Sequence, residues 1–257
     1  MGFLDRLFSK RTYDTLFGPL HVICMPNAQG ERVRIMELAG TFQSACLEGE
    51  KWAEVPFEYF RSFDALFQAE ASGHPMNHVL LLGGGGFAWP KHALTTRKHL
   101  SLDVVEVDPR IVEIARKHFY LDRLEEELAK AGEEDRLRIF CEDGAAFLQS
   151  STDAYDAIVN DVFQGNTVPE RFISEGFFAL VKDRLRPGGI YVQNVVADLS
   201  REGAYELFKL MTALNNTFGS VSILDATDEE FGGADNYILL ASDAEYPFEG
   251  ALGYTFG

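Results

Sequence analysis

Four short segments of this chain carry residues that could bind a small polar molecule or act on it. Each follows a run of apolar residues typical of a buried strand. The segments are Gly83-Gly84-Gly85-Gly86, Glu106-Val107-Asp108, Glu142-Asp143-Gly144 and Asn160-Asp161. In sheets of parallel strands, ligands bind outside the carboxyl ends of the strands. The sequence therefore predicts one site, built from glycines and carboxylates that converge at one edge of a sheet.

The first two segments are suited to a nucleoside. Glycines let the backbone turn sharply and approach a ligand closely, although many such turns are only structural. Glu106 follows about 20 residues later, where a carboxylate can accept hydrogen bonds from both ribose hydroxyls. Asp108 is placed to cap the next helix, so Glu106 is the better candidate ligand.

The third and fourth segments each end in an aspartate. Asp143 could accept a hydrogen bond from an adenine amino group, or it could cap the following helix, and the pattern leaves both roles open. Asp161 ends the fourth strand, where a carboxylate faces the reacting centre. Four suitable groups at four strand ends indicate a site more strongly than any one of them.

These segments require an alternation of strands and helices. Short apolar runs predict strands at 78–82, 102–107, 137–141, 155–159 and 190–196, with helical periodicity between them. Two more strands, 220–225 and 236–241, are joined by a link too short for a helical crossover, so we expect them to be antiparallel. The prediction is an α/β fold with a doubly wound, mostly parallel seven-stranded sheet. The antiparallel pair at its end resembles the arrangement in transferases of the S-adenosylmethionine type.

The chain divides into two parts. Residues 1–75 are expected to form a small β-rich piece, with strands in 19–49 and a connecting helix over 53–70. Residues 76–257 are expected to form the nucleotide-binding part. An apolar helical face at the N-terminus is expected to pack on the protein or on a partner subunit, and it consists of Phe3, Leu4, Leu7 and Phe8.

Composition excludes several classes of protein. The chain has 23 Lys and Arg against 40 Asp and Glu, a formal net charge of −17, which disfavours nucleic acid and anionic membranes as partners. Its three cysteines and six histidines show no metal-ligand or disulfide spacing, and His118 is expected to be a packed residue. This spacing predicts no metal site, and because no signal peptide or long apolar run is present, we expect a cytoplasmic protein.

The motifs resemble those of the spermidine synthases, the polyamine aminopropyltransferases. The similar segments are His78–Gly85, Val105–Pro109, Glu142–Phe147, Tyr155–Asp161 and Leu185–Gly189, with Ala39–Ser44 in the front part and Asn236–Ser242 at the last strand. The resemblance covers residues 19–243. The front segment with Gln43 is informative because generic methyltransferases lack it.

The resemblance implies an N-terminal β-domain, a nucleotide-binding sheet and a homodimer. It implies transfer of an aminopropyl group from decarboxylated S-adenosylmethionine to an amine, with Asp161 beside the attacking nitrogen. The implied nucleoside-binding residues are Gln43, Gly83, Gly84, Gly85, Glu106, Glu142, Asp143 and Gly144. Tyr59 and Gln164 would lie on the side of the amine substrate.

Two departures from the family pattern concern the amine. Gly86 stands where the family has an acidic residue, and Gln164 stands where it has a second carboxylate. An ammonium group without a partner is costly to bury, so putrescine itself is placed in doubt. Phe87, Trp89 and Phe163 are expected to make this end of the pocket more apolar.

Two alternatives remain open from the sequence. One is a methyltransferase that uses S-adenosylmethionine on a less cationic acceptor. The other is a non-catalytic, nucleoside-binding member of the family, against which the presence of Asp161 argues.

Overall fold

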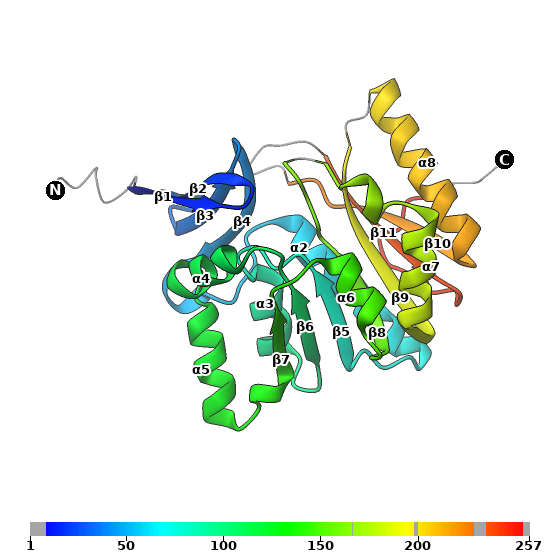
Figure 1. The fold of residues 1–257 in the computed structure, drawn as a ribbon, viewed down its shortest axis with the longest axis horizontal. Coiled ribbons are helices and arrows are strands. Elements are labelled where there is room, and N and C mark those ends of the chain that lie inside the picture. The colour runs from blue at the N-terminus through cyan, green and yellow to red at the C-terminus, as the bar shows by residue number, and fades with distance from the viewer. Residues whose placement is uncertain (1–8, 166, 198–199, 229–234, 254–257) are drawn as a thin grey trace.

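The computed structural model describes residues 9–165, 167–197, 200–228 and 235–253. The apolar face expected at Phe3, Leu4, Leu7 and Phe8 lies outside these described residues. The described chain forms two sheets, one of four strands and one of seven (Figure 1).

The seven-stranded sheet has the order β10-β11-β9-β8-β5-β6-β7. Its strands are β5 (His78–Leu82), β6 (Ser101–Val105), β7 (Leu137–Phe140), β8 (Tyr155–Asn160), β9 (Leu185–Val196), β10 (Ser220–Asp225) and β11 (Asn236–Ser242). The first five are parallel, and β11 is antiparallel to both β9 and β10, as the short link predicts. Strand order reverses between β5 and β8, which is where such sheets bind ligands.

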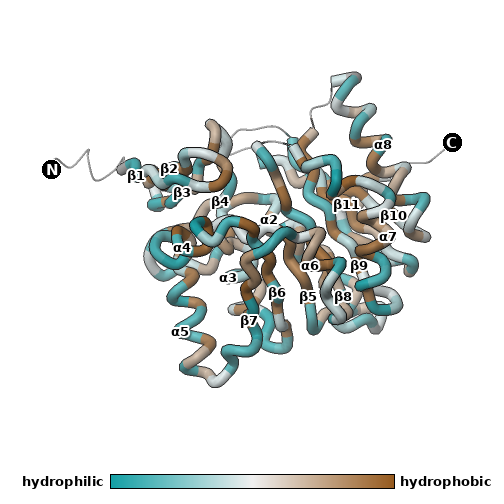
Figure 2. Tube along the Cα trace, viewed as in Figure 1, coloured by the Kyte–Doolittle hydropathy of each residue, from teal (hydrophilic) through white to brown (hydrophobic). Residues whose placement is uncertain are grey.

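Helices cover both faces of this sheet, as its strand pattern requires. Along β5, Val79 and Leu81 enter one hydrophobic core, whereas Leu80 and Leu82 enter the other. The first core includes residues of α3 (Ala88–Thr96), α4 (Pro109–His118) and α5 (Leu121–Ala131), and the second includes those of α6 (Gly144–Ser150), α7 (Glu175–Arg184) and α8 (Arg201–Thr217). Figure 2 shows the strongly hydrophobic central strands between these layers.

The four-stranded sheet is antiparallel throughout and forms the front part of the chain. Its strands are β1 (Ser9–Thr15), β2 (Gly18–Pro26), β3 (Arg32–Leu38) and β4 (Thr41–Leu47). The sequence did not predict β1. A 3-10 turn η1 (Gly49–Lys51) follows β4.

The connecting helix is shorter than predicted. It begins at Glu58 as α2 (Glu58–Ser62) and continues as the 3-10 segment η2 (Phe63–Ser72), rather than beginning at residue 53. Pro56 explains the late start, because a proline disfavours helical geometry at the residue before it.

The sequence also failed to predict α5. Its buried stripe is Leu121, Leu124 and Leu128, and its exposed face carries ion pairs such as Arg123 with Glu127. These are the signals of a solvated amphipathic helix. The chain enters α5 through Tyr120, whose φ of 61° is left-handed and separates α5 from α4.

The front sheet is docked on α4. Its buried Leu20 and Met36 pack with Ile111 and Ile114 of the helix. Beyond the end of α4, the fully buried Lys91 donates from Nζ to the carbonyl of Phe119 at 2.5 Å. A cation is favourable beside the carbonyls at a helix C-terminus, even though burial lowers the pKa of Lys91 to about 8. The apolar contacts between the front sheet and α4 place β2 to β4 beside the carboxyl edge of the large sheet.

Candidate functional site

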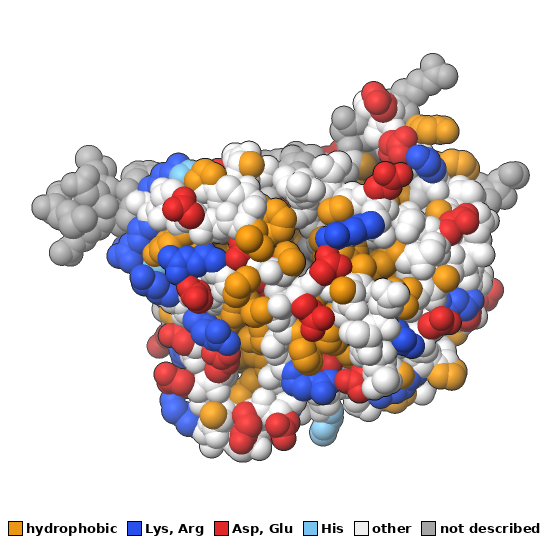
Figure 3. All heavy atoms as spheres, viewed as in Figure 1, with side chains coloured by type: hydrophobic (Ala, Val, Ile, Leu, Met, Phe, Trp, Pro, Cys, Tyr) orange, Lys and Arg blue, Asp and Glu red, His pale blue; other side chains and the backbone are white. Residues whose placement is uncertain are grey.

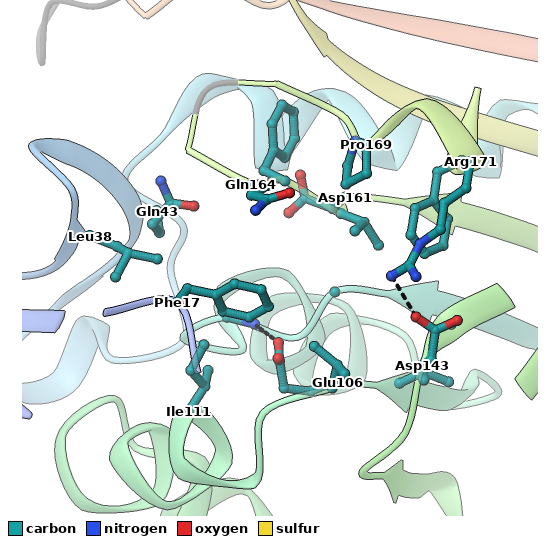
Figure 4. A pocket seen from close by; sticks show the side chains of 18 of the residues that line it. Phe17, Leu38, Gln43, Glu106, Ile111, Asp143, Asp161, Gln164, Pro169 and Arg171 are labelled. Atoms are coloured by element: carbon teal, nitrogen blue, oxygen red, sulfur yellow. Dashed lines mark hydrogen bonds and ion pairs between the residues drawn. The ribbon is translucent and has the colours of Figure 1, made fainter. Parts of the chain in front are cut away.

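A pocket of about 460 Å³ lies between the front sheet and the carboxyl edge of the large sheet. On the face shown in Figure 3, hydrophobic side chains gather in a hollow with acidic and basic side chains beside them. Of the residues predicted for the site, those that line the pocket are Gln43, Gly83, Gly85, Glu106, Asp143, Gly144, Asp161 and Gln164. The structure thus brings together residues from four strand ends and from the front sheet (Figure 4).

Glu106 is 6% exposed and binds the glycine loop. Its Oε2 accepts hydrogen bonds from the backbone N–H groups of Gly84 and Gly85, at 3.0 and 3.1 Å, and its Oε1 accepts from the N–H of Asp108 at 3.0 Å. Burial raises the pKa of Glu106, and these three donors oppose that shift. A carboxylate has about four acceptor positions, so little capacity remains for a ribose.

The glycine loop also contacts the end of β8. Gly83 has a φ of +91°, and a Cβ atom there would lie 2.5 Å from the carbonyl oxygen of Asp161. Only glycine is compatible with both the left-handed conformation and this close approach. The loop therefore fixes Asp161 relative to Glu106.

Asp161 is a partly buried carboxylate with one amide donor. Its Oδ1 accepts a hydrogen bond of 2.8 Å from Nδ2 of Asn194. Burial raises the pKa of Asp161 to about 7; the hydrogen bond from Asn194 lowers it, and the charge of Glu106 raises it. Near neutral pH such a group exchanges a proton readily, which suits it to general acid or base chemistry.

Asp143 caps α6, which is one of the two roles that the sequence left open. Its Oδ1 accepts from the N–H groups of Ala145 and Ala146, and its Oδ2 forms an ion pair of 2.6 Å with Arg171 (Figure 4). Both oxygens are thus engaged, so an adenine amino group would share them. The adenine role of Asp143 stays a prediction, and Glu142, which is exposed, lies outside the set of residues that line the pocket.

Tyr59 lies beside the pocket, although it is absent from its lining. Its hydroxyl donates to the backbone carbonyl of Gln43 at 3.2 Å. Burial raises the pKa of Tyr59, and the charges of Asp161 and Asp228 add to the shift. Asp228, whose Oδ2 accepts from the N–H of Glu58 at 3.1 Å, is therefore a further carboxylate on this side.

The two departures from the family pattern differ in their surroundings. A Cβ atom on Gly86 would lie only 2.6 Å from Oγ of Ser44, so an acidic side chain at this position requires Ser44 to move. Gln164 is exposed, and its backbone pairs with that of Thr167 at the pocket rim.

The prediction that Phe87, Trp89 and Phe163 make the pocket apolar was wrong for two of the three residues. Phe87 and Trp89 are fully buried in the core and do not line the pocket, whereas Phe163 does. Phe87 is the residue that precedes α3, and its own backbone is left-handed (φ 53°). This conformation directs its ring into the core, where it packs against Gly84. The pocket's apolar lining from the front part comes from Phe17, Leu20, Met36 and Leu38.

Several site residues were missed from the sequence. Phe17 lies in the turn between β1 and β2, and Arg171 lies in the 3-10 turn η4 (Glu170–Phe172). Neither stands at a strand end, so the rule that located the other residues could not find them. The N–H of Leu16 donates to Asp108 at 2.7 Å and so anchors the turn that carries Phe17.

The histidines and cysteines play no part in this pocket. His118 is packed as predicted, with Nε2 at 2.5 Å from the hydroxyl of Tyr13, and burial lowers its pKa to about 4. The described residues hold no group of three His, Cys, Asp or Glu side chains that could bind a metal ion. Among the helices of the same described ranges, none has the length and apolarity needed to cross a membrane.

Comparison with known sequences gives consistent matches. Residues 66–235, more than half of the chain, match the model of the spermine/spermidine synthase domain. The chain is 28% identical over 159 residues to a probable polyamine aminopropyl transferase of Bifidobacterium longum, and 28% identical over 174 residues to the polyamine aminopropyltransferase of Shigella sonnei. These matches cover 62% and 67% of this chain, but only 32% and 57% of the two relatives.

Comparison with solved structures supports the fold. A probable spermidine synthase from Corynebacterium glutamicum superposes with a TM-score of 0.73 at 24% identity, covering 92% of this chain and 81% of that one. Human methyltransferase-like protein 13, solved in complex with SAH, gives a TM-score of 0.57 at 21% identity over 76% of this chain and 85% of that one. At these identities the likeness concerns the fold alone.

The charge of Glu106 predicts a measurable effect on Asp161. Replacing Glu106 by Gln removes a negative charge and keeps the shape, so the pKa of Asp161 is expected to fall from about 7. Carbon-13 NMR titration of the aspartate carboxyls, with Asp161→Asn to assign the signal, measures the shift. Asp143→Asn is the control and is expected to leave that pKa unchanged; an unaltered pKa in Glu106→Gln would contradict the electrostatic coupling.

Proposed function

Because this chain belongs to the spermine/spermidine synthase family, we propose that it transfers an aminopropyl group from decarboxylated S-adenosylmethionine to an amine acceptor. The observation that carries the proposal is the position of Asp161, a carboxylate with a pKa of about 7, in the same pocket as Glu106 and Gln43. The cytoplasmic homodimer expected from the sequence stays a prediction.

The nucleoside is proposed to bind across the ends of β6 and β7. Glu106 would accept from a ribose hydroxyl at its remaining acceptor position, and the adenine would extend toward Asp143 and Arg171. Apolar contacts with Phe17 and Ile111, which line the pocket, support the faces of the sugar and base. These residues bind and orient the donor, and they do not act on the bond that breaks.

The reaction is a nucleophilic substitution. The amine nitrogen attacks the aminopropyl carbon next to the sulfonium, the carbon–sulfur bond breaks, and the electron pair leaves with sulfur as methylthioadenosine. An alkylamine is mostly protonated near neutral pH, so it must lose a proton before it attacks. In this proposal Asp161 accepts that proton and later releases it to solvent, while the pocket walls align the amine and exclude water during the transfer.

The donor is proposed to be the decarboxylated nucleoside. The reacting end of the pocket has the carboxylate of Asp161, and the carboxylate of Asp228 lies near Tyr59 on the same side. The negative charge of these two aspartates disfavours the carboxylate that S-adenosylmethionine itself carries. The family match also favours aminopropyl transfer over methyl transfer. The solved methyltransferase shares the fold, which does not distinguish the two reactions.

Nucleoside binding tests the proposed role of Glu106. Glu106→Gln keeps an acceptor oxygen but removes the charge, and we expect methylthioadenosine to bind about 10-fold more weakly, since hydrogen bonds to a charged group contribute roughly 1.5–3 kcal/mol. Isothermal titration calorimetry measures the change. Glu142→Gln, on an exposed side chain outside the pocket lining, is the matched control. An unchanged affinity in Glu106→Gln would contradict the proposal that the ribose binds at Glu106.

The role of Asp161 is tested by Asp161→Asn. The amide keeps the shape but cannot take a proton, so we expect turnover to fall by about 10²–10⁴-fold while methylthioadenosine still binds. Product mass spectrometry with each donor nucleoside measures the transfer. Full activity in the variant would reduce Asp161 to a structural role, and a wild-type protein that transfers nothing from either donor would contradict the proposed function.

The acceptor is expected to carry its positive charge at the reacting nitrogen only. Gly86 and Gln164 supply no carboxylate for a distal ammonium, so putrescine is predicted to be a weak substrate compared with a monoamine that has an apolar or neutral tail. A comparison of kcat/KM for putrescine, longer polyamines and monoamines tests this. Each 1.4 kcal/mol that a missing ion pair costs corresponds to about a 10-fold loss.

Asp228 provides the outcome that would contradict this expectation. It is a carboxylate near Tyr59 and so could face a distal ammonium. Efficient formation of spermidine at low putrescine would reject the monoamine preference. If Asp228→Asn loses this activity but keeps its activity with monoamines, Asp228 is the carboxylate that binds the distal ammonium.

A further inference from the structure

Asp161 is the end of a chain of side-chain amides. Nδ2 of Asn194 donates to its Oδ1 at 2.8 Å, and Nδ2 of Asn236 donates to Oδ1 of Asn194 at 3.0 Å. Asn194 is 2% exposed, and Asn236 is half-buried. Neither asparagine lines the pocket, so both reach it only through Asp161.

The antiparallel strand β11 makes this chain possible. Asn194 lies near the carboxyl end of β9, and its backbone partner on β11 is Ile238. Because β11 runs in the opposite direction, its first residue, Asn236, lies at the same edge as the carboxyl ends of the parallel strands. The N–H of Ala226 donates to the carbonyl of Asn236 at 2.8 Å and holds this strand start in place.

The direction of the hydrogen bonds follows from amide chemistry. The NH₂ group of Asn236 can only donate, so it faces the oxygen of Asn194. That contact turns the NH₂ group of Asn194 toward Asp161, where it can only donate as well. A carboxylate that accepts this hydrogen bond is favoured in its ionised form.

We infer that Asn194 and Asn236 are positioning residues that hold Oδ1 of Asp161 and leave its Oδ2 to accept the proton from the substrate. The holding of Oδ1 rests on the geometry alone, whereas the proton transfer to Oδ2 rests on the proposed function. Asn236 acts indirectly, because it keeps the amide of Asn194 in the orientation that donates to Asp161.

The other groups around Asp161 act against its ionisation. The charge of Glu106, at the end of β6, raises its pKa, as does burial. Tyr59 on α2 and Asp228 also lie on this side, and the charges of Asp161 and Asp228 both raise the pKa of the tyrosine. The hydrogen bond from Asn194 lowers the pKa of Asp161 and so opposes burial and the charge of Glu106 in part.

The experiment measures the pKa of Asp161 in the free protein, by carbon-13 NMR titration. Asn194→Leu removes the donor at similar volume, and the pKa is expected to rise by about one unit. Asn236→Leu leaves the donor but frees its orientation, so a smaller rise is expected, and Asn236→Gln should restore part of it. Asn216→Leu, on the exposed side of α8, is the control and should cause no change.

Two outcomes overturn the inference. An unchanged pKa in both Asn194→Leu and Asn236→Leu would show that the amides do not act on Asp161, and an equal rise in Asn216→Leu would show that the effect is not local. If Asn194→Leu does not fold, the half-buried Asn236→Leu and Asn236→Gln pair still decides the question.

A second readout separates this inference from the proposed function. In an active enzyme, the acid limb of the kcat/KM profile should move with the NMR pKa in each variant, while KM for the nucleoside stays the same. A protein that transfers nothing from either donor would fail the proposed function, and the NMR titration would still decide whether the amides hold Asp161.

Discussion

Two carboxylates, those of Glu106 and Asp161, share one pocket whose lining is largely apolar, and the rest of the site depends on keeping both in place. Burial raises the pKa of each, and the charge of Glu106 raises that of Asp161 further. A buried carboxylate stays ionised only where donors face it. Three backbone N–H groups face Glu106, and one side-chain amide faces Asp161. In the proposed function, this unequal supply of donors gives the two acids different tasks: Glu106 binds the nucleoside, and Asp161 exchanges a proton.

The fold supplies those donors through its topology. The glycine loop after β5 turns its N–H groups toward Glu106, and its close approach to the backbone of Asp161 explains why Gly83 carries no side chain. The antiparallel β11 brings Asn236 to the edge where the parallel strands end. The front sheet closes the remaining side, because its apolar contacts with α4 fix its position. The site is therefore shared between the two sheets.

Periodicity in the sequence predicted most of the large sheet, including the bounds of β5 and β10, because strands buried on both faces form continuous apolar runs. The rule that ligands meet strand ends located Glu106 and Asp161 in the pocket. It could not locate Phe17, which lies in a hairpin turn, or Arg171, which lies in a 3-10 turn. It also missed Asn194, which contacts the site only through its hydrogen bond to Asp161. Phe87 was misplaced because its inward direction follows from a left-handed backbone, which composition does not reveal.

The measurement that tests this account most directly is a crystal structure of the protein with bound methylthioadenosine. The account predicts the ribose at Glu106, the adenine toward Asp143 and Arg171, and the sulfur facing Asp161. With the sulfur in that position, the carbon that is transferred would meet an amine held beside the carboxylate. A nucleoside bound with its sulfur directed away from Asp161, or bound outside this pocket, would contradict the account.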